Sequence, residues 1–225
     1  TGIAGNSFDY PFLHGKGFAE AGYSYVSASA SSIENGSVDL SEYNVVDWIL
    51  GIQREWTVAR GAKPPKYKTF SKTQQQKITD YCNNGGNIIV SGAYVGTDFW
   101  DNKFADQADR DWAQQTLRFK WRNDRGAVTG KIKSVASPFE SISGNYEYYN
   151  KLNSESYVVE NPDAIEPADE NSFTVFRYSE NNLSAGVMYK GEQYNSCVLG
   201  FPIESIKTEE KQKELIKNIL DEFEK

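Results

Sequence analysis

Two stretches of the chain are almost continuously apolar and end at glycine, a pattern typical of strands buried on both faces. The first is YNVVDWILG, residues 43–51, which contains a single acid, Asp47. The second, NIIVSGAYVGTD, residues 87–98, continues into a Gly-x-x-x-Gly turn from Gly92 to Gly96. Because many α/β enzymes carry their nucleophile on a tight turn after a buried strand, this turn is the first candidate for chemistry.

Helical patterns lie between and after these strands. Residues 14–22, HGKGFAEAG, predict a helix that Gly22 ends, and YSYVSAS, residues 23–29, predicts a strand. Ser71 and Gln74 match a capping box at the start of a second helix, and residues 106–122 predict a third. A last helix from about Thr208 has an apolar stripe on one face, formed by Leu215, Ile216, Ile219, Leu220 and Phe223.

The pattern changes at Gly130 to short alternating runs separated by polar turns, which predict antiparallel hairpins. The earlier alternation of strands and helices predicts parallel strands joined by right-handed crossovers. We therefore expect an α/β fold of flavodoxin-like type. It would have a mostly parallel central sheet flanked by helices, with an antiparallel hairpin extension in the C-terminal half. No linker-like stretch divides residues 1–225, so we expect one domain, cut from a longer protein.

Composition excludes several classes of function. A formal net charge of −7 and a pI of about 4.9 give no basic surface for a nucleic-acid partner. No apolar run approaches the ~20 residues of a membrane span. Cys82 and Cys197 have no metal-type spacing and are expected to be buried free thiols. With His14 as the single histidine, we expect no metal site and no cofactor.

The architecture and two of the loops resemble the class I glutamine amidotransferase-like fold. In that family a cysteine stands at the centre of a Gly-x-Cys-x-Gly turn, and a late His-Pro-Glu segment supplies the base. Here Tyr94 stands in place of the cysteine, and the late GFPIES segment offers Phe201, Pro202 and Glu204 without a histidine. The resemblance implies a related module that lacks the thiol and the base of the amidotransferase reaction.

A second resemblance covers nearly the whole chain, from AGNSFDYPFLHGKG through GGNIIVSGAYVGTD to VLGFP. These runs look like a domain of large secreted bacterial proteins that are described as xanthan-lyase-like or polysaccharide-associated. The resemblance implies an extracytoplasmic setting, with a polysaccharide or cell-surface glycan and the neighbouring domains of the same chain as partners. It implies no particular reaction.

Two enzymatic alternatives remain open. An SGNH-type hydrolase would use Ser7 with His14, although the usual late Asp-x-x-His is absent. A carboxylate-based lyase or glycosidase would use Asp98 with Asp101 or Glu204, and its substrate carboxylate would need Arg54 or Arg60. Each of these residues also has an ordinary structural reading, as a cap, a hydrogen-bonding group or a solvated acid.

Glycan binding requires less than catalysis, because flat rings stack on sugar faces and carboxylates accept hydroxyl hydrogens. The residues on loops that we expect to converge are Asp9, Tyr10, Trp56, Tyr94, Asp98 and Trp100. The competing interpretation is that these rings belong to the core at the rim of the sheet. The leading hypothesis from the sequence is a non-catalytic amidotransferase-like module of a secreted glycan-related protein, which serves in glycan binding or domain assembly.

Overall fold

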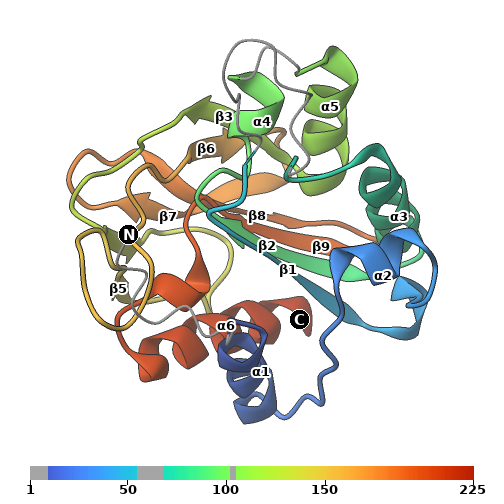
Figure 1. Cartoon of the computed structure of the whole chain (residues 1–225), viewed down its shortest axis with the longest axis horizontal. Helices are drawn as coiled ribbons and strands as arrows, with labels where there is room; N and C mark the ends of the chain where they lie inside the picture. Colours follow the sequence, from blue (N-terminus) through green and yellow to red (C-terminus); the bar gives the residue numbers. More distant parts are fainter. Residues whose placement is uncertain (1–9, 55–67, 102–104) are drawn as a thin grey trace.

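A seven-stranded sheet runs through the middle of the computed structural model, which describes residues 10–54, 68–101 and 105–225 (Figure 1). The strand order is β1-β2-β9-β8-β7-β4-β5. These strands are β1 (Val45–Gly51), β2 (Asn87–Gly92), β4 (Lys131–Ser134), β5 (Asn145–Glu147), β7 (Ser172–Tyr178), β8 (Ser184–Lys190) and β9 (Asn195–Leu199). A separate antiparallel pair consists of β3 (Phe119–Asn123) and β6 (Ala164–Pro167).

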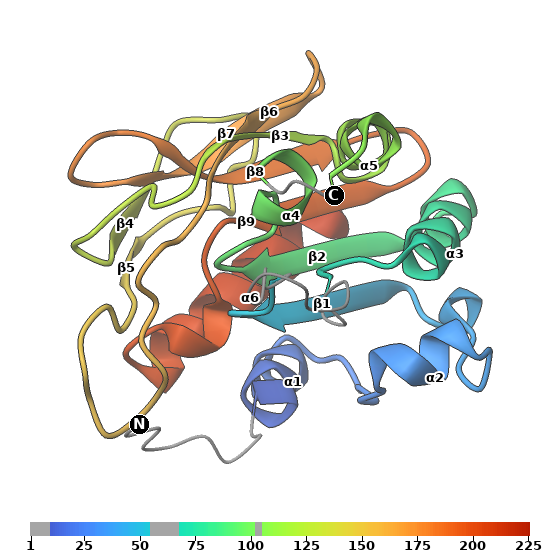
Figure 2. The same ribbon diagram turned by 45° about the horizontal axis from the view of Figure 1, so that its top comes forward.

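Helices cover both faces of this sheet (Figure 2). α1 and α6 lie together on one side, and α2 and α3 lie near the N-terminal ends of β1 and β2 (Figures 1 and 2). The helices are α1 (Tyr10–Glu20), α2 (Ala30–Glu34), α3 (Lys72–Asn83), α4 (Thr97–Trp100), α5 (Gln107–Trp112) and α6 (Glu209–Phe223). Short 3₁₀ turns span Leu40–Glu42 and Ile203–Ser205, and a π-helical turn spans Ala113–Leu117.

The predicted flavodoxin-like, mostly parallel sheet is wrong. Only β1, β2 and β9 run parallel, and every pair from β9 to β5 is antiparallel. The cause is β9, which comes from the C-terminal hairpins yet inserts beside β2, where Ile88–Ser91 pair with Ser196–Leu199. The hairpins therefore belong to the main sheet instead of extending it, and the mixed sheet curls around the core (Figure 2).

The predicted strand at residues 23–29 has no strand structure, and neither has SYVVE, residues 156–160, one of the alternating runs that follow Gly130. The third predicted helix ends at Leu117, because Arg118 adopts a left-handed conformation (φ 65°) and β3 follows. In contrast, the capping box of α3 is confirmed. The Gln74 amide donates to Ser71 Oγ at 3.2 Å, and the Ser71 amide donates to Gln74 Oε1 at 3.0 Å.

The core consists of two apolar clusters. Helices α1 and α6, which lie together on one side of the sheet, contribute to the first cluster and not to the second. The apolar stripe of α6 is buried in the first cluster, as its spacing predicted. α1 packs closely on α6, since a Cβ added at Gly17 would lie 2.7 Å from Ile216. Cys82 and Cys197 are free and fully buried, which confirms the prediction.

Candidate functional site

The turn after β2 is closed by a buried carboxylate that the sequence analysis did not select. Asp163 accepts four hydrogen bonds there: from the Gly96 amide at 2.7 Å, the Thr97 amide at 2.9 Å, Thr97 Oγ1 at 2.6 Å and Trp121 Nε1 at 2.9 Å. Backbone amides on such a turn are the groups that would stabilise an oxyanion in an acyl-transfer enzyme. In this protein an internal carboxylate already takes them.

The main chain also fixes the position of Asp163. Its amide donates to the Ala93 carbonyl at 2.8 Å, and its own carbonyl accepts from Tyr178 Oη at 2.8 Å. Gly200 lies against the same carbonyl, which a Cβ at that position would approach to 2.1 Å. Burial raises the pKa of Asp163 to about 7, although the four donors favour its charged form.

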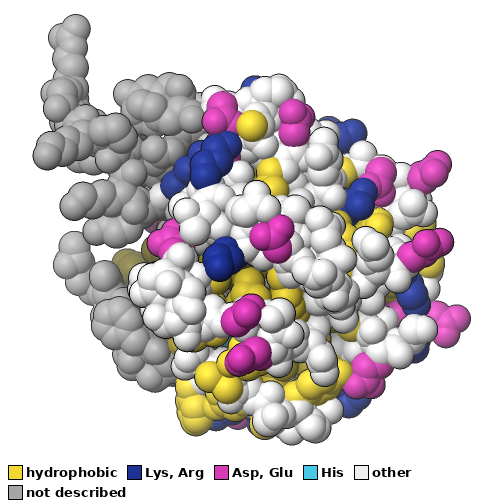
Figure 3. Space-filling model, turned by 90° about the vertical axis from the view of Figure 1, so that its right-hand side faces the viewer, with side chains coloured by type: hydrophobic (Ala, Val, Ile, Leu, Met, Phe, Trp, Pro, Cys, Tyr) yellow, Lys and Arg dark blue, Asp and Glu magenta, His cyan; other side chains and the backbone are white. Residues whose placement is uncertain are grey.

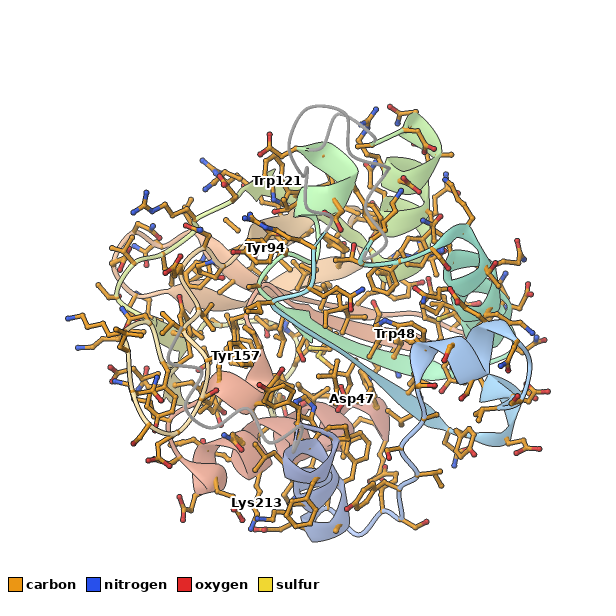
Figure 4. All side chains as sticks on the ribbon, viewed as in Figure 1. Asp47, Trp48, Tyr94, Trp121, Tyr157 and Lys213 are labelled. Carbon is orange, nitrogen blue, oxygen red and sulfur yellow. The ribbon has the colours of Figure 1, made fainter. Side chains whose placement is uncertain are left out.

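Tyr94, at the centre of the Gly92–Gly96 turn, is only 8% exposed. The Arg54 guanidinium carbon lies 4.5 Å from the centroid of the Tyr94 ring, an arrangement typical of cation–π contact. The ring therefore has the core on one side and an arginine on the other. Tyr94 and Trp121 lie on the same part of the molecule, apart from Asp47 and Tyr157 (Figure 4).

Trp100 and Asp98 are also built into the packing around this turn. Trp100 contacts Phe119, with ring centroids 5.8 Å apart, and is partly buried against the second core cluster. The Asp98 carboxylate is 1% exposed and accepts the amide of Thr69 at 2.9 Å. Of the remaining predicted site residues, Ser7, Asp9, Trp56 and Arg60 lie outside the described residues.

The second notable cluster surrounds His14, which projects from α1 towards the sheet. His14 Nδ1 lies 2.6 Å from Asp47 Oδ2 of β1, and Nε2 lies 3.2 Å from Glu204 Oε2. Tyr157 Oη donates to the other oxygen of Glu204 at 2.8 Å. Asp47 and Tyr157 both lie on the side of β1 that faces α1 and α6 (Figure 4). We call these four side chains the His14 cluster.

The His14 cluster holds its histidine as an imidazolium. Burial acts to lower the pKa of His14, but the carboxylates of Asp47 and Glu204 outweigh it and raise this pKa to about 10. Both ring nitrogens then carry protons and donate to the two carboxylates. A general base must be unprotonated near the working pH, so His14 is poorly suited to that role.

Burial, with the neighbouring Glu204, also raises the pKa of Tyr157 well above its ordinary value, so its hydroxyl stays protonated as a donor. Gly51 closes the same region with a φ of 55°, and a Cβ there would lie 3.3 Å from both Glu204 Oε1 and Tyr157 Oη. Asp47 Oδ1 is buried and has no hydrogen-bond partner among the described residues. Among the four carboxylate oxygens of the His14 cluster it is thus the one without a hydrogen-bond partner in the described residues.

The sequence suggested Glu204 and Asp98 as a catalytic carboxylate pair, but the two carboxylates have different hydrogen-bond partners. Glu204 bonds to His14 and Tyr157, whereas Asp98 bonds to Thr69. Asp47 could have been selected from the sequence, since it is the single acid in an otherwise apolar strand. Asp163 and Tyr157 had no such signal, because both stand in irregular stretches whose partners are distant in sequence.

Within the described ranges, no three His, Cys, Asp or Glu side chains come together in a way that could hold a metal ion. The helices of those ranges include none long and apolar enough to cross a membrane. Figure 3 shows the face beside α2 and α3, where Lys, Arg, Asp and Glu side chains are scattered.

Neither the family models nor the curated proteins contain a match to this chain. Solved structures do match. A β-galactosidase from Halorubrum lacusprofundi superposes with a TM-score of 0.54 and 14% identity, over 98% of this chain and 28% of the enzyme. The cytoplasmic protein STM3548 from Salmonella typhimurium has a TM-score of 0.56 and 13% identity, over 93% of this chain and 85% of its own.

An exo-β-1,4-mannosidase from Opitutaceae bacterium strain TAV5 is similar as well, with a TM-score of 0.53 and 10% identity, over 96% of this chain and 31% of the enzyme. The chain therefore spans about a quarter of the β-galactosidases that it matches. At these identities the likeness shows a shared fold. The fold occurs both as one part of large enzymes and as most of a small protein.

Proposed function

We propose that this chain is a non-catalytic module of a larger carbohydrate-related protein, and that it serves in the assembly of that protein. The observation that carries the proposal is the Asp163 carboxylate bound to the Gly96 and Thr97 amides. An acyl-transfer site needs these donors free for the developing oxyanion. Here the position is filled by the protein itself, and Tyr94 takes the place of the nucleophile.

The His14 cluster supports the same conclusion. The single histidine is an imidazolium between two carboxylates, and burial limits its access to substrate. A serine hydrolase that used Ser7 would need this ring neutral, since it must accept the hydroxyl proton. A carboxylate enzyme built around Asp98 would need that group accessible, but it is 1% exposed.

The carbohydrate context is supported by the solved structures that share the fold, among them β-galactosidases and a mannosidase of which this fold makes up a quarter to a third. The sequence resemblance to polysaccharide-associated domains points the same way and adds an extracytoplasmic setting to the proposal. Since a fold alone does not fix a reaction, the proposed role is assembly, with glycan binding by Tyr10, Trp56 or Trp100 left as a separate prediction.

A turnover assay tests the proposal. The purified chain is offered p-nitrophenyl esters, p-nitrophenyl glycosides and glutamine, beside the variants Ser7→Ala and Tyr94→Phe. We expect all three proteins to match the rate of buffer, because residues 10–54, 68–101 and 105–225 bring together no attacking group with a base and free oxyanion donors. Turnover by the wild type that either variant abolishes, with unfolding unchanged, would defeat the proposal.

A further inference from the structure

A groove of about 680 Å³ runs along the outer edge of β1. β1 is the first strand of the sheet and, among the described residues, pairs only with β2. The other wall of the groove is the irregular segment of residues 23–28, between α1 and α2. In Figures 1 and 2 this segment passes beside β1 without joining the sheet.

β1 has the sequence of an interior strand. Natural edge strands are usually protected by lysine, proline or a bulge, and parallel strands are usually covered on all sides. Residues 45–51, VVDWILG, contain neither lysine nor proline, and the irregularity in the pairing of β1 with β2 lies at the end of the strand, between Ile49 and Gly51. The Asn44 carbonyl accepts the Asn87 amide on the β2 side, so strand alternation directs the main-chain groups of Val45, Asp47 and Ile49 towards the groove.

The opposite wall explains a failed prediction. Residues 23–29 have a strand-like pattern, yet they form no strand and leave Tyr25 and Val26 45% and 69% exposed. A β-strand is stabilised by cross-strand pairs and ladder hydrogen bonds, so a strand-like sequence without a neighbour stays irregular. β1 and residues 23–28 thus both have strand-like sequences, and the groove between them has the place of one further strand.

The charged residues that line the groove indicate what kind of strand could bind there. Within the described residues, its lining includes the acids Glu42 and Asp47 and the imidazolium of His14, which is already paired with Asp47 and Glu204, but no lysine or arginine. An occupant that is apolar and free of acids would match these walls.

We propose that the groove receives a β-strand, which pairs with β1, from the polypeptide that flanks residues 1–225 in the full-length protein. This inference rests on the proposed assembly role and gives it a physical site. Tyr10, the first described residue, lines the groove itself, so the proposed strand is the one on the N-terminal side of the chain. A strand tethered there would be held near the groove at high effective concentration.

Hydrogen exchange tests this inference on the full-length protein and on the 225-residue chain. The amides of Val45, Asp47 and Ile49 are followed by NMR or mass spectrometry. An added strand would bond to the main chain facing the groove, so we expect these amides to exchange about tenfold or more slowly in the full-length protein. Amides of β2 serve as an internal reference, because β2 is paired on both sides in either form.

Two exposed aliphatic residues provide a variant and its control. Val26→Asp places a carboxylate on the groove wall, whereas Leu152→Asp changes an 86% exposed side chain outside the lining. In the full-length protein Val26→Asp should remove the added protection and Leu152→Asp should leave it intact. In the 225-residue chain neither change should alter exchange at β1.

Equal exchange of β1 in the two forms would overturn the inference, and so would protection that appears only after a second protein is added. Loss of protection in both variants would also count against it, because the effect would then not depend on the groove. Turnover in the substrate assay would defeat the non-catalytic proposal without altering these exchange rates, so the two failures are distinguishable.

Discussion

At the scale of single residues, the His14 cluster is a buried array of charges whose parts depend on one another. His14 is 2% exposed and lies between two carboxylates. Burying either sign alone is expensive, but a paired and hydrogen-bonded cluster is tolerated. The sequence identified His14 and Glu204 as candidates, although for other roles. It gave no sign that the two meet, because 190 positions separate them.

Removal of the histidine charge should destabilise the fold strongly. His14→Gln leaves Asp47 and Glu204 facing each other without a cation, and breaking a buried ion pair in this way costs about 3–5 kcal/mol. Lys16→Gln on the same helix is the control, because it removes the partly exposed Lys16–Glu209 pair and should cost under about 1 kcal/mol. Urea unfolding of the three proteins measures both values. Equal losses would contradict the account.

The same histidine makes stability depend on pH. Its pKa in the folded protein, about 10, lies above the ordinary value of 6.5, so the folded state holds a proton that the unfolded chain has released. The resulting stabilisation is complete below pH 6.5 and is lost as the pH rises towards 10. The free energy of unfolding should fall by up to about 1.4 kcal/mol per pH unit in this window.

Urea titrations at pH 6.5, 7.5 and 8.5 check this slope, and the same series on His14→Gln shows whether it belongs to His14. The variant should lose most of the dependence in this range. A slope that persists unchanged in the variant would assign it to other groups.

At the scale of elements, the sequence predicted what is local and missed what depends on distant partners. The capping box of α3 and the buried stripe of α6 follow from residues three or four positions apart, and both are confirmed. The position of β9 beside β2 depends on which edge the hairpins join, and no local pattern encodes that choice. Residues 23–29 failed for the same reason, because a strand needs a neighbour.

The start of α3 offers a quantitative test of a local signal. Ser71→Ala removes the side chain that accepts the Gln74 amide and should cost about 1 kcal/mol. Thr73→Ala, at an exposed position of the same helix, should be neutral or slightly stabilising, since alanine has the higher helix propensity. Thermal unfolding of both variants measures the difference. A neutral Ser71→Ala would show that the cap does not contribute.

At the scale of the whole molecule, the fold is shared with parts of much larger enzymes, and the likeness is to the architecture. The sequence pattern identified the turn after β2 as a candidate reactive site. It could not predict that the amides of this turn are already bonded to Asp163, because this residue lies 66 or 67 positions away from them. A pattern predicts where a reactive turn would stand, but only the tertiary structure reveals whether its donors are free.

The central claim, that this turn is closed by the protein itself, is tested most directly by the hydrogen exchange of two amides, those of Gly96 and Thr97. Bonded to a fully buried carboxylate, both should exchange as slowly as amides in the core strand β2. If instead they exchange at rates close to those of an unstructured chain, as free oxyanion donors open to water would, the claim is contradicted.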